Sequence, residues 1–179
     1  MKDFSAMIEA LRSDGPYADL APKLQLFGQF VGSWDVEITN YKPDGSREVV
    51  QGEWHFGWVL EGRAIQDVWI APKRSLRETS KGVTGDYGAT LRFYDPKIDA
   101  WRSTWIGPVK GYVLPFIARQ VGDEIVLEGN FESGKSRKWI FSDITIESFK
   151  WRAVESDDGW LTQQKVQEMS ARRKKTQAD

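Results

Sequence analysis

The sequence predicts an all-β protein, an up-and-down antiparallel β-barrel of about ten strands preceded by short N-terminal helices. From residue 31 onward apolar and polar residues alternate with a period of two, which is the pattern of strands that bury one face. Gly, Pro, Asp and Ser residues interrupt this alternation at short intervals, and no crossover helices separate the strands. Strands connected this closely pair as a meander, and closing the meander into a barrel removes its edges.

The first thirty residues have a helical period instead. Four apolar residues share one face of a helix that Gly15-Pro16 ends: Phe4, Met7, Ile8 and Leu11. A second short helix is predicted over 22–29, because Pro22 suits a first helical turn. We therefore expect a helical segment at residues 1–30 that packs on the barrel, the barrel itself at 31–170, and a charged tail at 171–179.

The first two predicted strands indicate which face is buried. In the stretch FVGSWDVEITNY the apolar residues Trp34, Val36 and Ile38 alternate with polar ones. The second strand places Trp54 and Trp58 on one face, with Phe56 between them on that same face. Further strands are predicted at residues 64–70, 87–94, 101–106, 110–120, 124–131, 138–142, 148–155 and 160–169.

One long connection interrupts the meander. Residues 71–86, APKRSLRETSKGVTGD, lack the alternation and are locally basic through Lys73, Arg74, Arg77 and Lys81. A loop of this length is uncommon in a compact domain and is often functional, although a solvated surface loop is the commoner interpretation.

Composition excludes several functional classes. The 25 Lys and Arg residues balance 26 Asp and Glu residues, so no overall field attracts nucleic acid or an anionic membrane, and no partner of either kind is expected. No apolar stretch approaches the length of a membrane span, and no secretory signal is evident, so we expect a cytoplasmic protein. The chain has no cysteine, which excludes disulfides and thiolate nucleophiles. With a single histidine and no calcium-loop spacing, no metal site is expected.

The sequence resembles an uncharacterised bacterial family of calycin-like barrels, in the superfamily of the lipocalins and fatty-acid-binding proteins. The likeness rests on Gly32-Ser33-Trp34 in FVGSWDVE, followed by YGATLRFYDPKIDAWRSTWIGP, WIFSDITIESFKWRAVESDDG and WLTQQKVQEMSARR. It implies a barrel of eight to ten strands with an internal cavity, in which Trp34 plugs one end and Arg172 or Arg173 packs across it. Haem barrels of the nitrobindin type begin similarly, but their ligating histidine lies late in the chain. Here no histidine follows His55, and no cofactor is expected.

Nine tryptophans indicate either a filled core or a surface for a flat ligand. A ten-strand barrel has more internal room than a small one, so we expect aromatic residues to line a pocket for an apolar molecule. The residues expected to bind the ligand are Trp54, Phe56, Trp58, Trp69, Arg92, Tyr94, Trp105, Tyr112 and Trp139.

Polar residues on the strands would set specificity. Arg92 shares a strand face with Thr90 and Tyr94, and an inward guanidinium would require a carboxylate partner or an anionic ligand. His55 faces outward if Trp54 and its face point inward, so no catalytic residue is assigned.

Three functional hypotheses follow. The leading one is binding or carriage of a small hydrophobic or aromatic, possibly anionic, ligand in the tryptophan-rich interior. An alternative is a lyase or isomerase acting on such a molecule, which would need His55, Glu53 or Tyr94 to face inward. A third is a module that forms a homodimer without a ligand, for which a collapsed interior would be expected.

Overall fold

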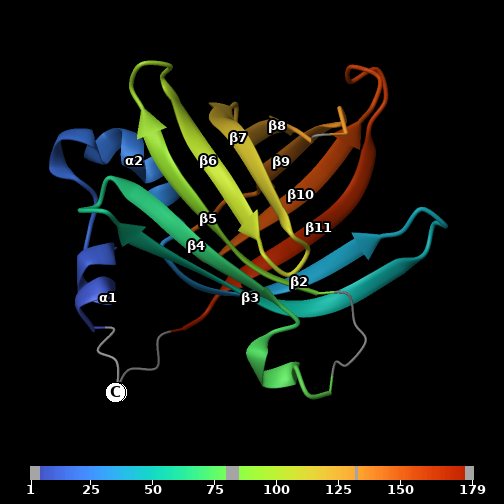
Figure 1. Cartoon of the computed structure of the whole chain (residues 1–179), viewed down its shortest axis with the longest axis horizontal. Coiled ribbons are helices and arrows are strands. Elements are labelled where there is room, and N and C mark those ends of the chain that lie inside the picture. The colour runs from blue at the N-terminus through green and yellow to red at the C-terminus, as the bar shows by residue number, and fades with distance from the viewer. Residues whose placement is uncertain (1–4, 80–84, 132, 176–179) are drawn as a thin grey trace.

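In the computed structural model, which describes residues 5–79, 85–131 and 133–175, ten antiparallel strands close into a barrel with two short α-helices beside it (Figure 1). The elements are α1 (Ser5–Leu11), β1 (Arg12–Ser13), the 3₁₀ turn η1 (Ala18–Leu20), α2 (Ala21–Gly28), β2 (Gly32–Tyr41), β3 (Arg47–Val59), β4 (Ala64–Ala71), the 3₁₀ turn η2 (Arg74–Leu76), β5 (Asp86–Asp95), β6 (Ala100–Gly107), β7 (Tyr112–Val121), β8 (Glu124–Asn130), β9 (Ser136–Ser142), β10 (Ser148–Ser156) and β11 (Gln164–Arg173).

The barrel is an up-and-down meander. Each strand from β2 to β10 pairs with the next along the chain, and β11 pairs back with β2 to close the cylinder. The two-residue strand β1 pairs with the end of β3, beyond the point where β2 begins. The predicted fold class is therefore confirmed, including the number of strands in the barrel within the described residues.

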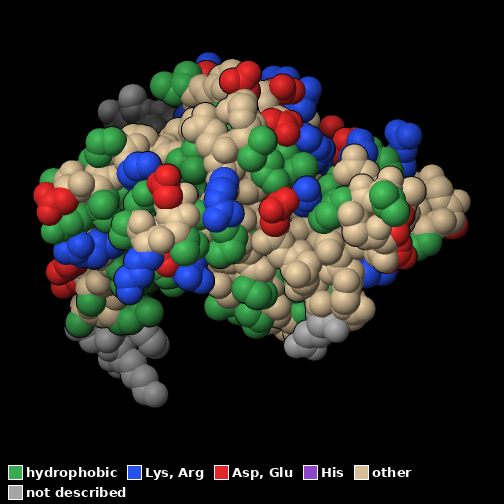
Figure 2. Space-filling model, turned by 90° about the horizontal axis from the view of Figure 1, so that it is seen from above, with side chains coloured by type: hydrophobic (Ala, Val, Ile, Leu, Met, Phe, Trp, Pro, Cys, Tyr) green, Lys and Arg blue, Asp and Glu red, His purple; other side chains and the backbone are tan. Residues whose placement is uncertain are grey.

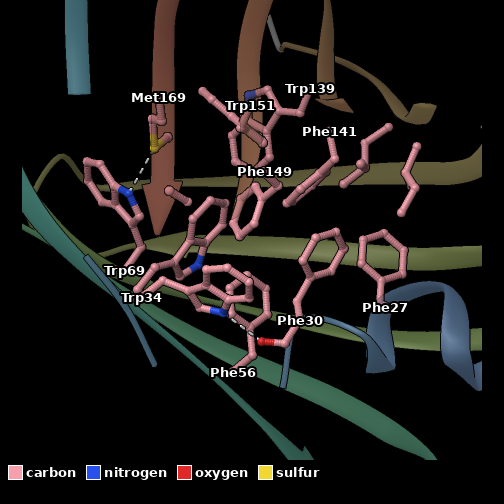
Figure 3. Packing of buried hydrophobic residues seen from close by; sticks show 14 of the residues in the cluster. Phe27, Phe30, Trp34, Phe56, Trp69, Trp139, Phe141, Phe149, Trp151 and Met169 are labelled. Carbon is pink, nitrogen blue, oxygen red and sulfur yellow. Dashed lines mark hydrogen bonds between the residues drawn. The ribbon is translucent and has the colours of Figure 1, made fainter. Parts of the chain in front are cut away.

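Helix α2 covers one end of the barrel. Its Leu24 and Phe27 side chains are completely buried, and the Phe27 ring meets the Trp101 ring edge to face at 4.9 Å. Phe30, just after the helix, packs 4.9 Å from both Phe141 and Phe149, so phenylalanine rings fill this end (Figure 3). Because these rings occupy the interior, the α2 end of the barrel is closed.

Helix α1 contributes little to this core. It has no buried residue, and its apolar side chains Met7 and Ile8 are 60% and 52% exposed. Of the predicted helical segment at residues 1–30, α2 and Phe30 supply the fully buried packing on the barrel, Tyr17 and Leu20 before α2 are partly buried against the core, and Phe4 lies outside the described residues.

The Gly-x-Trp sequence at the start of β2 forms the junction between the two ends of the chain. Trp34 is fully buried and its indole N–H donates to the Phe30 carbonyl at 2.8 Å (Figure 3). The guanidinium of Arg173, from the end of β11, lies 4.1 Å from the centre of the Trp34 ring and donates to the Val31 carbonyl at 2.7 Å. The resemblance pointed to Arg172 or Arg173 for this contact, and Arg173 makes it.

Gly32 is required by this contact. Its φ is +129°, a conformation that residues with a side chain rarely adopt, and a β-carbon there would lie 2.6 Å from Arg173 Nη1. The first residue of the Gly-x-Trp sequence therefore makes room for the arginine that packs on its last residue.

The last strand differs from the prediction of residues 160–169. Asp158 accepts hydrogen bonds from the Thr162 backbone and hydroxyl at 3.0 and 2.6 Å, which holds the chain in a turn, and Trp160 within it has a φ of +71°. Strand β11 begins only at Gln164 and continues to Arg173, three residues into the segment expected to be a charged tail. The alternation alone was wrong here because it did not register the side-chain hydrogen bonds that extend the turn.

The surface carries charges of both signs. On the face seen in Figure 2, Lys and Arg side chains lie among Asp and Glu side chains without a large region of one sign. Among the described residues no helix is long and apolar enough to cross a membrane. The predicted long loop contains η2, and its residues 80–84, including Lys81, lie outside the described residues.

We predict that Gly32→Ala lowers the free energy of unfolding by about 1–3 kcal/mol, because it combines an unfavourable φ with displacement of Arg173. The measurement is urea unfolding followed by circular dichroism. Gly57→Ala is the matched control, since nothing lies within 4 Å of a β-carbon there and its φ is not in the left-handed region. Equal stability of the two variants would show that the Gly32 contact does not matter.

Candidate ligand-binding site

Five tryptophan side chains form a ring around the interior of the barrel. Their ring centres are separated by 6.2 Å between Trp69 and Trp105, 6.0 Å between Trp105 and Trp139, 5.4 Å between Trp139 and Trp151, and 6.4 Å between Trp151 and Trp54. Trp54 and Trp69 complete the ring as direct cross-strand partners in β3 and β4. Each of these four measured contacts is edge to face, the favourable geometry for aromatic pairs. We call this set the indole collar.

Small residues on neighbouring strands make the collar possible. Gly88 of β5 is the cross-strand partner of Trp69, and a β-carbon there would lie 2.5 Å from the Trp105 ring. Trp139 similarly faces Ala153 across β9 and β10. Large and small side chains therefore alternate around the wall, which lets bulky indoles lie against it instead of blocking the centre.

A cavity of about 360 Å³ lies inside the collar and extends to the barrel end opposite α2. All five collar tryptophans line it, together with Met169, and its rim is formed by the β2–β3 hairpin and by Lys110 before β7. Figure 3 shows Trp69, Trp139, Trp151 and Met169 converging on this side of the core. The volume lies at the lower end of the range for small-molecule sites, so it suits a molecule of two or three fused rings.

Two pairs of polar residues in the wall satisfy each other. Asn40 accepts a hydrogen bond from the Gln167 amide at 2.6 Å, between β2 and β11. Arg137 of β9 forms an ion pair with Glu155 of β10 and lies over the Phe131 ring at 4.0 Å. Because its charge is already compensated, Arg137 does not require an anionic ligand.

The remaining charged residues of the cavity include two carboxylates. Asp86 lies 3.9 Å from the Lys110 ammonium and accepts a long hydrogen bond from the Tyr112 hydroxyl at 3.5 Å. Burial, and then the negative charge of Asp86, raise the pKa of Tyr112, so its hydroxyl stays protonated and can donate at neutral pH. One oxygen of Glu48 is buried without a hydrogen-bond partner among the described residues. Within the same residues, no three His, Asp or Glu side chains are grouped as metal ligands would be.

The cavity brings together five of the nine residues expected at the site from the sequence: Trp54, Trp69, Trp105, Tyr112 and Trp139. The other four lie elsewhere. Phe56 and Arg92 belong to the core under α2, and the Trp58 ring packs against Gly28 of that helix. Tyr94 lies in a surface groove beside α2, where its hydroxyl donates to Asp99 at 2.5 Å.

Arg92 does point into the barrel, and its partner is a carboxylate. It is completely buried, forms an ion pair with the equally buried Asp67 of β4, and lies 5.0 Å from the Phe27 ring and 5.5 Å from the Phe56 ring. Asp67 also accepts a hydrogen bond from the Thr90 backbone at 3.3 Å. The requirement inferred from the sequence is therefore met within the protein, at the end of the barrel that α2 closes.

His55 lies on the outer wall, as the alternation predicted. Its two ring nitrogens are 2.9 Å from the Ser33 hydroxyl and 3.1 Å from the Glu53 carboxylate. The Arg74 guanidinium of η2 covers Glu53, whose side chain is only 7% exposed, with hydrogen bonds of 2.8 and 3.1 Å. These hydrogen bonds lower the pKa of Glu53 far below its usual range. With His55 and Glu53 outside and Tyr94 beside α2, none of the candidates named for the enzyme alternative lies in the cavity.

Sequence reasoning omitted several residues of the cavity wall. Glu48 and Arg137 lie an even number of positions from the predicted residues Trp54 and Trp139, so the alternation does place them on the inner face. The strand that holds Trp151 had no residue in the predicted site. The alternation does not tell which end of the barrel these residues occupy, because that depends on the register between strands. Asp86 begins β5 just after the long loop, where no alternation precedes it.

No family model matches the chain. Two solved structures share its fold: the S-type phycobiliprotein lyase CPES from Guillardia theta, 12% identical with a TM-score of 0.58, and Rv2717c from M. tuberculosis, 16% identical with a TM-score of 0.57. The first alignment covers 86% of this chain and 93% of the lyase, and the second covers 88% of this chain and all of Rv2717c. At these identities the likeness shows the fold alone.

We predict that Arg92→Met destabilises the protein by about 3–5 kcal/mol, because it leaves Asp67 buried and unpaired. The double variant Arg92→Met with Asp67→Asn removes both charges and should recover at least half of this loss, measured by urea unfolding. Additive losses in the double variant would contradict a direct ion pair.

We predict a pH-dependent effect of Glu53→Gln. Since the folded-state pKa of Glu53 lies below the unfolded value of about 4.3, its stabilisation is complete at neutral pH and is lost as the pH falls below that value. Glu53→Gln should therefore cost about 1.5–3 kcal/mol at neutral pH and progressively less in acid, measured by unfolding across pH. Glu37→Gln, on the exposed face of β2, is the control, and a constant difference across pH would disprove the role of Arg74.

Proposed function

We propose that the protein binds a small, flat, largely apolar molecule in the cavity inside the indole collar. The observation that supports this proposal is the collar itself, in which five tryptophans surround a volume of about 360 Å³. Aromatic walls give a flat molecule a large contact area with few rotatable side chains to immobilise. The opposite end of the barrel provides a contrast, since its phenylalanines and α2 pack against one another.

The arrangement of the wall supports binding in one orientation. The aromatic part lies deep, and the polar residues Asp86, Lys110, Tyr112 and Glu48 lie toward the rim. Such a division places the apolar body of a ligand inside and its polar substituents near the mouth or against specific donors. A homodimerisation module without a ligand would be expected to have a collapsed interior, which the cavity argues against.

We further infer that the chain is a member of the bacterial calycin-like family that its sequence resembles. The contact of Arg173 with Trp34 beside Gly32 supports this inference, as does the common fold of the two solved structures. Family membership would add no activity, since one fold serves many functions.

The proposal is tested by titrating the protein with 2-isopropenylnaphthalene and 2-acetylnaphthalene while following tryptophan emission. We predict that at least one of them binds with micromolar affinity and changes the emission, because five indoles line the cavity. Ala153→Leu, which places an isopropyl group in the cavity, should weaken binding at least tenfold, or about 1.4 kcal/mol.

Ala89→Leu is the matched control, because Ala89 lies on the outer face of β5 next to the exposed Ile106. It makes the same chemical change without entering the cavity and should leave affinity unchanged. The proposed site would be wrong if neither compound bound to the folded protein, or if Ala153→Leu and Ala89→Leu weakened binding equally.

A further inference from the structure

The indole collar contains buried hydrogen-bond donors without acceptors. Among the described residues, the indole nitrogens of Trp54, Trp105 and Trp151 are buried and have no hydrogen-bond partner. All three side chains are at least nine-tenths buried and all three line the cavity. The Tyr112 hydroxyl lies near the Trp105 nitrogen but makes no well-aligned hydrogen bond with it. An indole N–H can only donate, so each of these groups requires an acceptor.

Two other tryptophans of the barrel, Trp34 and Trp69, have acceptors. The Trp34 N–H donates to the Phe30 carbonyl at 2.8 Å, and the Trp69 N–H is directed at the Met169 sulfur at 3.3 Å (Figure 3). The three indoles without a partner all line the cavity, where a bound molecule could supply acceptors, whereas the other buried donors without a hydrogen bond among the described residues, on Arg92 and Ser103, lie outside it. Because a buried donor without an acceptor is unfavourable, these indoles favour a ligand that carries hydrogen-bond acceptors.

The charges of the cavity decide between a neutral and an anionic acceptor. The cation Arg137 is already paired with Glu155, Lys110 lies near Asp86, and the third cation, Lys42, is exposed at the rim. Glu48 adds a carboxylate oxygen that is buried without a partner among the described residues. A ligand carboxylate held deep in the collar would lie near two acidic residues, and the described residues offer it no free buried cation, which disfavours an anion.

We propose that the ligand is a neutral conjugated molecule bearing a carbonyl group, whose oxygen accepts hydrogen bonds from the indole N–H groups of Trp54 and Trp151, two neighbours of the collar. This inference rests on the proposed function of the cavity and specifies the chemistry of its ligand. It departs from the anionic ligand that the sequence left open, because Arg92, the one fully buried arginine among the described residues, is neutralised by Asp67.

Three naphthalenes with one ring system and different substituents test it: 2-acetylnaphthalene, its hydrocarbon isostere 2-isopropenylnaphthalene, and 2-naphthoate. The ketone should bind at least as tightly as the hydrocarbon although it is less hydrophobic, and at least tenfold more tightly than the carboxylate at neutral pH. Tighter binding of the hydrocarbon or of the carboxylate than of the ketone would overturn the inference and leave the proposed cavity intact. Binding by none of the three would overturn both.

Nuclear magnetic resonance of the protein labelled with ¹⁵N in its indoles gives a direct second measurement. Comparing the ketone complex with the hydrocarbon complex removes the ring-current effect that both share. The N–H protons of Trp54 and Trp151 should lie further downfield in the ketone complex, whereas the Trp34 signal should coincide in the two. Assignment uses Trp54→Phe, Trp105→Phe and Trp151→Phe. Identical indole spectra in the two complexes would show that the carbonyl does not reach these donors.

Discussion

Closure of the barrel depends on the contact between Arg173, at the end of β11, and Trp34, near the start of β2. Closing a ten-strand meander requires β2 and β11, which are far apart in the sequence, to pair along their length. Arg173 lies over Trp34 at 4.1 Å and donates to carbonyls of the segment that links α2 to β2, including that of Gln29 at 2.8 Å. One side chain thus joins the end of the sheet, the start of the sheet and the helix that covers the barrel. The glycine at position 32 is the condition for this approach.

Because side chains fill the α2 end of the barrel, the cavity lies toward the opposite end. The phenylalanine cluster under α2 and the buried pair of Arg92 and Asp67 occupy the interior near the helix. Beyond them the aromatic residues become tryptophans, held against the wall by glycine and alanine on neighbouring strands. The two halves use the same kind of side chain in opposite ways. In one half the rings pack on each other, and in the other they surround a volume of about 360 Å³.

The outer wall shows that polar clusters in this protein do not all concern the ligand. Ser33, His55 and Glu53 lie in a row of short contacts, but Glu53 is committed to Arg74 of the long connection between β4 and β5. Arg74, one of the four basic residues that made this loop conspicuous in the sequence, therefore fastens it to the barrel. The donors that we propose for the ligand are instead buried indole N–H groups, and the sequence does not show which of its tryptophans lack an acceptor.

The alternation of apolar and polar residues by itself determined the all-β class, the meander and the inward direction of Trp54, Phe56 and Trp58, because side chains of a strand alternate between its faces whatever the strand pairs with. The cost of burying an unpaired charge also meant that Arg92 would need a partner if it faced inward. Only the tertiary structure decided that this partner is Asp67, that Trp54 lines a cavity while Phe56 and Trp58 lie toward α2, and that Trp151 completes the collar. Those facts depend on strand register and on closure of the sheet, which bring together residues from β3 and β10 that no local pattern relates.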